Sequence, residues 1–189
     1  MLSGGIRNLF MLTDKTKVKS YLGITDTSSD SLFDSLCAGI SKFITDYVDR
    51  NIERGTTTEY FDGRDTVVLK NYPILSVTSI KHNVGTQAEP QWYTIDPINY
   101  VVYKSEGKIA IGGGVVRGYQ NLEVVYEAGY STVPEDVEMV ATQLVAKMFE
   151  TRKAQGKLKE ALGGAQIDWK NELTFEQKEI LTNYSSWSL

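Results

Sequence analysis

One broad apolar stripe between residues 28 and 50 constrains the fold of this chain more than any other feature. Its members recur at spacings of three and four, which bring side chains onto one face of an α-helix. They are Leu32, Phe33, Leu36, Cys37, Ile40, Phe43, Ile44, Tyr47 and Val48. The preceding segment, Asp26-Thr27-Ser28-Ser29-Asp30, is dense in residues that cap helix N-termini. The pattern therefore predicts a helix of roughly 30 Å that buries one side against the rest of the chain.

Between about residues 56 and 130 the apolar period changes to two. Leu122, Val124 and Tyr126, for example, fall on one face of an extended chain, while Glu123 and Glu127 fall on the other. Glycine and asparagine residues interrupt the alternation throughout, as they do at turns between antiparallel strands. We therefore expect an antiparallel β-sheet over 56–130.

Two more helices are predicted on either side of these elements, at 13–22 and 134–152. The second opens with Pro134 at its first position, and Glu135 and Asp136 follow in the favourable first turn. The order of elements indicates an α+β fold, with a helical core of about three to four helices, an inserted antiparallel β-sheet and a C-terminal helix or tail. The predicted domains are an N-terminal extension over 1–11, a core domain over 12–152, and a linker with a C-terminal helical segment over 153–189.

The C-terminal segment carries several large apolar side chains beyond a glycine-containing linker. They are Trp169, Phe175, Leu181, Tyr184 and Trp187. Large rings on a tethered segment are typical anchors for docking into a partner protein. The alternative is that the segment folds back on its own core, and the sequence alone does not decide between the two.

A small basic cluster lies where the predicted third helix ends. It consists of Arg152, Lys153, Lys157 and Lys159. Four positive charges can contact phosphates, for instance in a DNA channel. A solvated helix end is the alternative, because cations also stabilise a helix C-terminus.

No set of residues in the sequence has the pattern of an active site. The one histidine, His82, has no nucleophile signature around it, and Gly112-Gly113-Gly114 lacks both the dinucleotide fingerprint and the P-loop pattern. The acidic residues show no calcium-loop spacing, and Cys37 lies within the helical stripe. We therefore predict no enzymatic activity, no cofactor and no metal site.

The overall charge and apolar content favour a protein made and used in a cytoplasm. The net charge of −4 does not draw the chain onto nucleic acid or an anionic membrane. No stretch approaches the roughly 18–20 apolar residues of a membrane span, and the N-terminus lacks the pattern of a signal peptide.

Seven short passages, taken in order over about residues 12–150, point to a known family. They are Val18-Lys19-Ser20-Tyr21-Leu22-Gly23-Ile24, Tyr47-Val48-Asp49-Arg50, Tyr60-Phe61-Asp62-Gly63, Leu69-Lys70-Asn71-Tyr72-Pro73-Ile74, Val77-Thr78-Ser79-Ile80, Val124-Val125-Tyr126-Glu127-Ala128-Gly129-Tyr130 and Pro134-Glu135-Asp136-Val137. In their order and spacing they resemble the head–tail connector proteins of tailed double-stranded DNA phages, also called adaptor or head-completion proteins.

The resemblance implies a structural virion subunit at the head–tail junction, assembled in the host cytoplasm. Its implied partners are other copies of itself in a ring of about twelve, the portal protein, and a tail or tail-completion protein. It also implies that double-stranded DNA passes through the ring without sequence-specific contacts, and that no membrane is involved. In this hypothesis the helices hold the subunit together, the strands make ring contacts, and the C-terminal helix reaches a neighbour or the portal.

Two alternative functions remain open at the level of sequence. One is a small hydrolase-like domain that uses scattered carboxylates, with His82 and Asp62 as the residues to replace. The other is a nucleic-acid-binding module built on residues 152–159, whose binding would fall steeply with salt.

Overall fold

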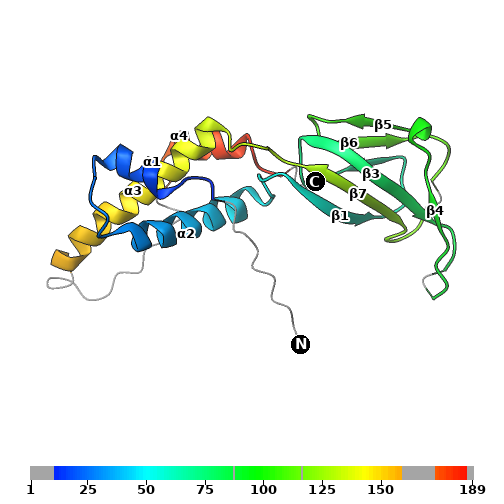
Figure 1. Ribbon diagram of the computed structural model, residues 1–189. Helices are drawn as coiled ribbons and strands as arrows, with labels where there is room; N and C mark the ends of the chain where they lie inside the picture. The colour runs from blue at the N-terminus through cyan, green and yellow to red at the C-terminus, as the bar shows by residue number, and fades with distance from the viewer. Residues whose placement is uncertain (1–10, 87, 116, 159–172, 187–189) are drawn as a thin grey trace. The chain divides into compact units, whose positions relative to one another are not determined.

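The computed structural model describes residues 11–86, 88–115, 117–158 and 173–186 (Figure 1). The chain divides into two compact units. A helical unit combines the chain up to Asp49 with Val133–Ser185, and a sheet unit consists mainly of Arg50–Thr132. The predicted α+β class is confirmed, and the helical unit is assembled from segments on both sides of the sheet unit in the sequence.

The helical unit contains the predicted helices with shifted ends. They are α1 (Lys15–Leu22), α2 (Asp30–Val48), α3 (Glu135–Leu158) and α4 (Phe175–Thr182). Helix α1 begins where the side chain of Asp14 accepts hydrogen bonds from the backbone N–H groups of Thr16 and Lys17, and it ends at Gly23 with φ of +68°. Helix α3 continues through Gly156 to Leu158, six residues beyond the predicted end at residue 152.

The apolar stripe of α2 forms the centre of the helical core. Phe33, Cys37, Ile40, Ile44 and Val48 are all buried. The ring of Phe33 packs on that of Phe149 from α3, with ring centroids 4.6 Å apart. The segment before α1 is tied into the same core, because Leu12 N–H donates to Ser41 Oγ at 2.9 Å and the hydroxyls of Thr13 and Thr142 lie 2.7 Å apart.

The sheet unit contains seven strands and one short 3₁₀-helix among the described residues. They are β1 (Gly55–Phe61), β2 (Thr66–Val68), β3 (Ile74–Asn83), β4 (Trp92–Thr94), η1 (Pro97–Asn99), β5 (Tyr100–Tyr103), β6 (Lys108–Ile111) and β7 (Leu122–Ala128). They form two antiparallel sheets, a four-stranded one in the order β1-β7-β3-β4 and a three-stranded one in the order β2-β6-β5.

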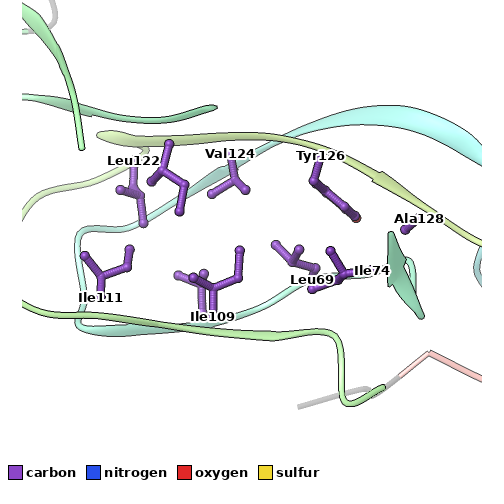
Figure 2. Close-up of a cluster of buried hydrophobic side chains, with 10 residues drawn as sticks. Leu69, Ile74, Ile109, Ile111, Leu122, Val124, Tyr126 and Ala128 are labelled. Atoms are coloured by element: carbon purple, nitrogen blue, oxygen red, sulfur yellow. The ribbon is translucent and has the colours of Figure 1, made fainter. Parts of the chain in front are cut away.

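The core of the sheet unit lies between the two sheets (Figure 2). From β7, Leu122, Val124 and Tyr126 point toward Ile109 and Ile111 of β6. Each sheet thus buries one face against the other, which is the arrangement of a small β-sandwich. The sequence predicted one inserted sheet, and the structure has two. Alternation identifies which side chains face inward, but it does not identify which strands pair.

Candidate functional site: protein-interaction surfaces

The C-terminal helix α4 is built by a capping box and packs within the helical unit. The Thr174 side chain accepts from the Gln177 backbone, and the Gln177 side chain accepts from the Thr174 backbone. Gln177 Nε2 also donates to Gln143 Oε1 of α3 at 2.9 Å, and Tyr184 OH donates to Asp136 at 2.8 and 3.0 Å. These contacts hold α4 beside the first half of α3.

The five predicted partner-contact residues have different surroundings. Leu181 is completely buried in the helical unit, and Tyr184 is half-buried with its hydroxyl bound to Asp136. The side chains of these two residues already have partners within the chain. At Leu181 and Tyr184 the segment therefore folds back on its own core. Phe175 differs, since 77% of it is exposed. Trp169 and Trp187 lie outside the described residues.

Three of the four residues of the predicted basic cluster fall on the last two turns of α3. Arg152 is exposed there. Lys153 and Lys157 lie four positions apart on the same helix, so their backbones share one helix face, while Lys159 lies outside the described residues. Positive charge at this helix end is favourable for the helix dipole in any case.

The residues considered for chemistry have structural roles. His82 is 7% exposed, and its Nε2 lies 3.4 Å from Asn121 Nδ2. Asp62 Oδ1 accepts from the backbone of Gln120 at 3.0 Å, which holds the loop that precedes β7. Gly113 and Gly114 have φ of +88° and +77°, so these glycines serve a turn that other residues rarely adopt.

The described ranges contain neither a cluster of metal-ligating side chains nor a helix suited to a membrane. Nowhere in 11–86, 88–115, 117–158 and 173–186 do three or more His, Cys, Asp or Glu residues gather in a way that could hold a metal ion. None of the helices in these ranges has the length and hydropathy needed to cross a membrane.

The sheet unit presents two opposite sides that are defined by its edge strands. β1 and β2 are the first strands of their sheets, and Asn71 Nδ2, just after β2, donates to Thr57 Oγ1 of β1 at 3.3 Å. β4 and β5 are the last strands. Ile74 N–H at the start of β3, the neighbour of β4, donates to O of Lys104, the residue just after β5, at 2.8 Å. We call these the β1/β2 side and the β4/β5 side.

The β4/β5 side carries an exposed apolar group that sequence reasoning missed. Ile98 is 86% exposed, Val101 57% and Tyr103 40%. We call these three residues the β5 strip. Val101 and Tyr103 alternate along β5 with Tyr100 and Val102, which pack against the core. The absence of any charged residue from 97 to 103 was the one signal in the sequence that could have revealed the strip.

The outward face of the four-stranded sheet carries paired charges and two aromatic rings. Glu123 accepts from Lys81 Nζ at 3.0 Å and from Tyr60 OH at 2.9 Å, and Arg54 donates to both oxygens of Glu127 at 2.7 and 3.2 Å. The ring of Tyr60 also meets that of Trp92, with centroids 6.4 Å apart. The hydrogen bond from Lys81 is the main reason that the pKa of Glu123 lies below its ordinary value of 4.5.

The lowered pKa of Glu123 predicts a loss of stability in acid. A carboxylate whose pKa is lower in the folded than in the unfolded chain stabilises the fold above about pH 4.5 and loses that contribution as the pH falls through its folded pKa. Glu123→Gln is therefore expected to reduce the slope of unfolding free energy against pH below 4.5. Chemical denaturation at a series of pH values measures this slope. Lys81→Met, which removes the main cause, is expected to reduce it too, and an unchanged slope in both variants would contradict the assignment.

A family model described as "Head completion protein" matches residues 11–185 of this chain. The match therefore covers both units. No curated protein is significantly similar to the sequence.

Three solved structures are similar to this chain in fold. A chain from the neck of an empty gene transfer agent (GTA) particle, computed with C6 symmetry, has a TM-score of 0.55 at 16% identity, covering 92% of this chain and 89% of that one. A chain from the virion of a native GTA particle has a TM-score of 0.55 at 12% identity, and the match covers 87% of this chain and 81% of that one. A chain from the neck of a native GTA particle, computed with C12 symmetry, has a TM-score of 0.52 at 12% identity, and the match covers 88% of this chain and 94% of that one.

Proposed function

The chain belongs to the head completion protein family, and on this premise we propose that it is a structural subunit of the neck between the head and the tail of a phage-like particle. The resemblance to connector proteins in the sequence is thereby confirmed at the level of the family. The observation that carries the proposal is the family match over 11–185, because it includes the helices and the sheets alike. In this role the subunit needs surfaces for neighbours rather than an active site, so we propose no enzymatic activity.

The proposed assembly is a ring that joins the portal to the tail and extends the DNA channel. Contacts repeated head to tail around an axis close into a ring, and many copies turn modest contacts into a durable joint. Neck structures computed with C6 and with C12 symmetry contain chains of this fold, which supports rotational order with about twelve copies. The partners in this proposal are other copies of the chain, the portal protein and a tail or tail-completion protein.

The channel through this ring would pass double-stranded DNA without sequence-specific contacts. A subunit with a net charge of −4 does not bind DNA strongly overall, which suits a duplex that must move. Arg152, Lys153, Lys157 and Lys159 are the proposed points of phosphate contact. If they face the channel, replacing them weakens binding of any duplex sequence and reduces its salt dependence.

Electron microscopy of portal-bearing particles mixed with the full-length chain tests the proposed function. The expected result is a ring of added density at the portal, with the rotational order of the neck. Particles without the portal provide the control and should remain bare. If portal-bearing particles show no added density at saturating protein, the proposal is wrong.

The exposed ring of Phe175 is the best candidate on α4 for a contact with the portal. Truncating an anchor residue at the centre of an interface typically costs about 2 kcal/mol or more, so Phe175→Ala is expected to weaken binding to portal-bearing particles at least roughly tenfold. Because the residue is 77% exposed, the thermal midpoint of the free protein should hardly change. Co-sedimentation with the particles measures the affinity.

Tyr21→Ala is the matched control for this measurement. It also removes an exposed ring from the helical unit, since Tyr21 is 61% exposed on α1. It is expected to leave binding unchanged. Equal binding of the wild type and Phe175→Ala would exclude Phe175 as a portal anchor.

A further inference from the structure

Strand β5 is apolar on both of its faces. Its four residues are Tyr100, Val101, Val102 and Tyr103. Tyr100 and Val102 pack against the core between the sheets, whereas Val101 and Tyr103 of the β5 strip point outward. An antiparallel sheet that meets water on one side normally alternates apolar and polar side chains, while a continuous apolar run is typical of a strand that is covered on both faces. The composition of β5 is therefore that of a strand with a second cover.

The apolar character extends across the outer face of the whole three-stranded sheet. Its pairing places two rows of side chains there, since Ala110 of β6 lies between its partners on β2 and β5, and so does Lys108. Lys108 is the one charged residue in the two rows, and its ammonium group lies over the ring of Tyr103, 4.9 Å from the centroid. We call the six residues the three-strand face: Thr66, Val68, Val101, Tyr103, Lys108 and Ala110. A contiguous apolar surface of this kind marks an interaction site.

The outer face of the four-stranded sheet points in the opposite direction, because the two sheets bury their inner sides against each other (Figure 2). Its middle row is uncharged and consists of Val125 of β7 between Thr58 of β1 and Ser79 of β3. We call the outer face centred on this row the four-strand face. The rings of Tyr60 and Trp92 lie on it and are 47% and 38% exposed. Tyrosine and tryptophan are enriched in protein interfaces and among the residues that stabilise them most.

The charged side chains beside the middle row of the four-strand face are paired with each other. Glu123 Oε1 lies 3.0 Å from Lys81 Nζ, and Glu127 Oε1 lies 2.7 Å from Arg54 Nε. Two carboxylates and two cations cancel, so these residues do not repel the lone cation of the three-strand face. Covering a charge that is already paired and hydrogen-bonded costs much less free energy than covering an isolated one. The four-strand face can therefore receive an apolar surface.

Resting on the proposed ring, we propose that the three-strand face of each subunit packs flat on the four-strand face of the next copy. The two faces point in opposite directions on one unit, so the contact repeats from copy to copy around an axis and closes into a ring. Packing of one three-strand face on another would end at a pair, because it uses the same surface twice. In the ring the neighbouring copy supplies the second cover of β5, at the spacing of about 10 Å at which sheets pack face to face.

Opposite charges placed at the centres of the two faces test this contact. Ala110 lies on the middle strand of one sheet and Val125 on an inner strand of the other, so these residues lie close together when the faces meet. Ala110→Lys and Val125→Glu each put an isolated charge into the contact, and each is expected to weaken ring assembly on portal-bearing particles at least roughly tenfold. The double variant Ala110→Lys/Val125→Glu brings opposite charges together, and it is expected to assemble at least roughly tenfold better than either single variant.

Ala110→Lys/Val125→Lys is the matched control, because it changes the same two positions but brings like charges together. It is expected to assemble no better than the single variants. Both residues are half-buried, so the thermal midpoint of each free variant is measured beside its assembly. If the opposite-charge variant keeps the wild-type midpoint and does not recover assembly, the proposed contact is wrong. Equal recovery in the like-charge control would also overturn it.

Val101→Lys is a second test in a position that preserves the fold, because Val101 is 57% exposed. It is expected to weaken ring assembly at least roughly tenfold. Ring occupancy should also rise less steeply with protein concentration, since contacts between neighbours make the filling of a ring cooperative. Met139→Lys is the control, because Met139 is 48% exposed on α3 of the helical unit, and it is expected to assemble like the wild type. Wild-type assembly of Val101→Lys would exclude the three-strand face from the contact.

The outcomes for the contact and for the function are distinguishable. A weakened Val101→Lys without recovery in the opposite-charge variant would mean that the three-strand face meets a different surface, and this result removes the contact alone. A wild-type ring on portal-bearing particles then leaves the proposed function standing. The absence of any ring with the wild-type chain removes the proposed function, and the contact with it.

Discussion

Gly129→Ala is expected to destabilise the sheet unit by at least about 3 kcal/mol. Gly129 has φ of +102°, and a Cβ built on it would lie 2.3 Å from Glu53 O, 2.6 Å from Glu53 C and 2.9 Å from Arg54 N. All three are backbone atoms, so no side-chain rotation relieves the clash. The same glycine donates its N–H to Pro73 O at 3.0 Å. Its neighbour Tyr130 pairs with the segment after α2, through Tyr130 N–H to Ile52 O at 2.8 Å. The substitution therefore disturbs a point where three segments of the unit meet.

Gly113→Ala measures the free-energy cost of placing alanine at a positive φ without a steric clash. Gly113 also has a positive φ, of +88°, but nothing lies within 4 Å of the Cβ position. This variant is expected to lose only about 1–2 kcal/mol. Hydrogen exchange of β1 and β7 amides, with chemical denaturation, measures both effects. Similar losses in the two variants would mean that φ alone matters and that the close approach to Glu53 does not.

Phe33→Ala is expected to destabilise the helical unit by about 3–5 kcal/mol. Phe33 is completely buried and packs on Phe149 with ring centroids 4.6 Å apart. Its loss leaves a cavity between α2 and α3 and removes an aromatic pair that contributes about 0.5–1.5 kcal/mol beyond the buried area. The loss of hydrogen-exchange protection should appear in α2 and α3.

Phe175→Ala is the matched control for the Phe33 variant, because the chemical change is identical. At 77% exposure, its removal is expected to change the free energy of unfolding by no more than about 0.5 kcal/mol. A loss below about 1 kcal/mol in Phe33→Ala would contradict the assignment of this ring to the centre of the core.

The helices are the part of the fold that the local sequence pattern predicted best. The stripe from Leu32 to Val48 predicted a long helix with one buried side, and in the structure Phe33, Cys37, Ile40, Ile44 and Val48 are buried on α2. The 3.6-residue period is a property of the chain itself, so the sequence reveals it without knowledge of any neighbour. Glycine within α3 misled the prediction, because Gly156 indicated a linker although α3 continues to Leu158. A single helical glycine costs only about 1 kcal/mol, which the rest of a helix can offset.

The candidate surfaces could not be predicted from the local sequence pattern. Sequence reasoning selected the C-terminal rings and leucine by residue type, yet Leu181 is buried within the chain while Phe175 is exposed. It did not select Val101 or Tyr103, because apolar residues in a predicted strand are ordinarily assigned to the core. Nor did it select Ile98, which lies outside the strands, in η1. Whether a residue on a strand faces the core or the solvent depends on which sheet the strand joins and on which face of that sheet is covered by the other sheet.

The sequence by itself determined the class of elements, their order and the family of the protein. Apolar periodicity, helix caps and short sequence motifs are local features that can be recognised without knowing which segments pack together. Only the tertiary structure decided that the strands form two sheets, that α4 packs on α3, and that the β5 strip lies on the side opposite β1. The physical reason is that pairing and exposure are relations between distant segments. Ile74 meets Lys104, and Tyr184 meets Asp136, through contacts that no local spacing encodes.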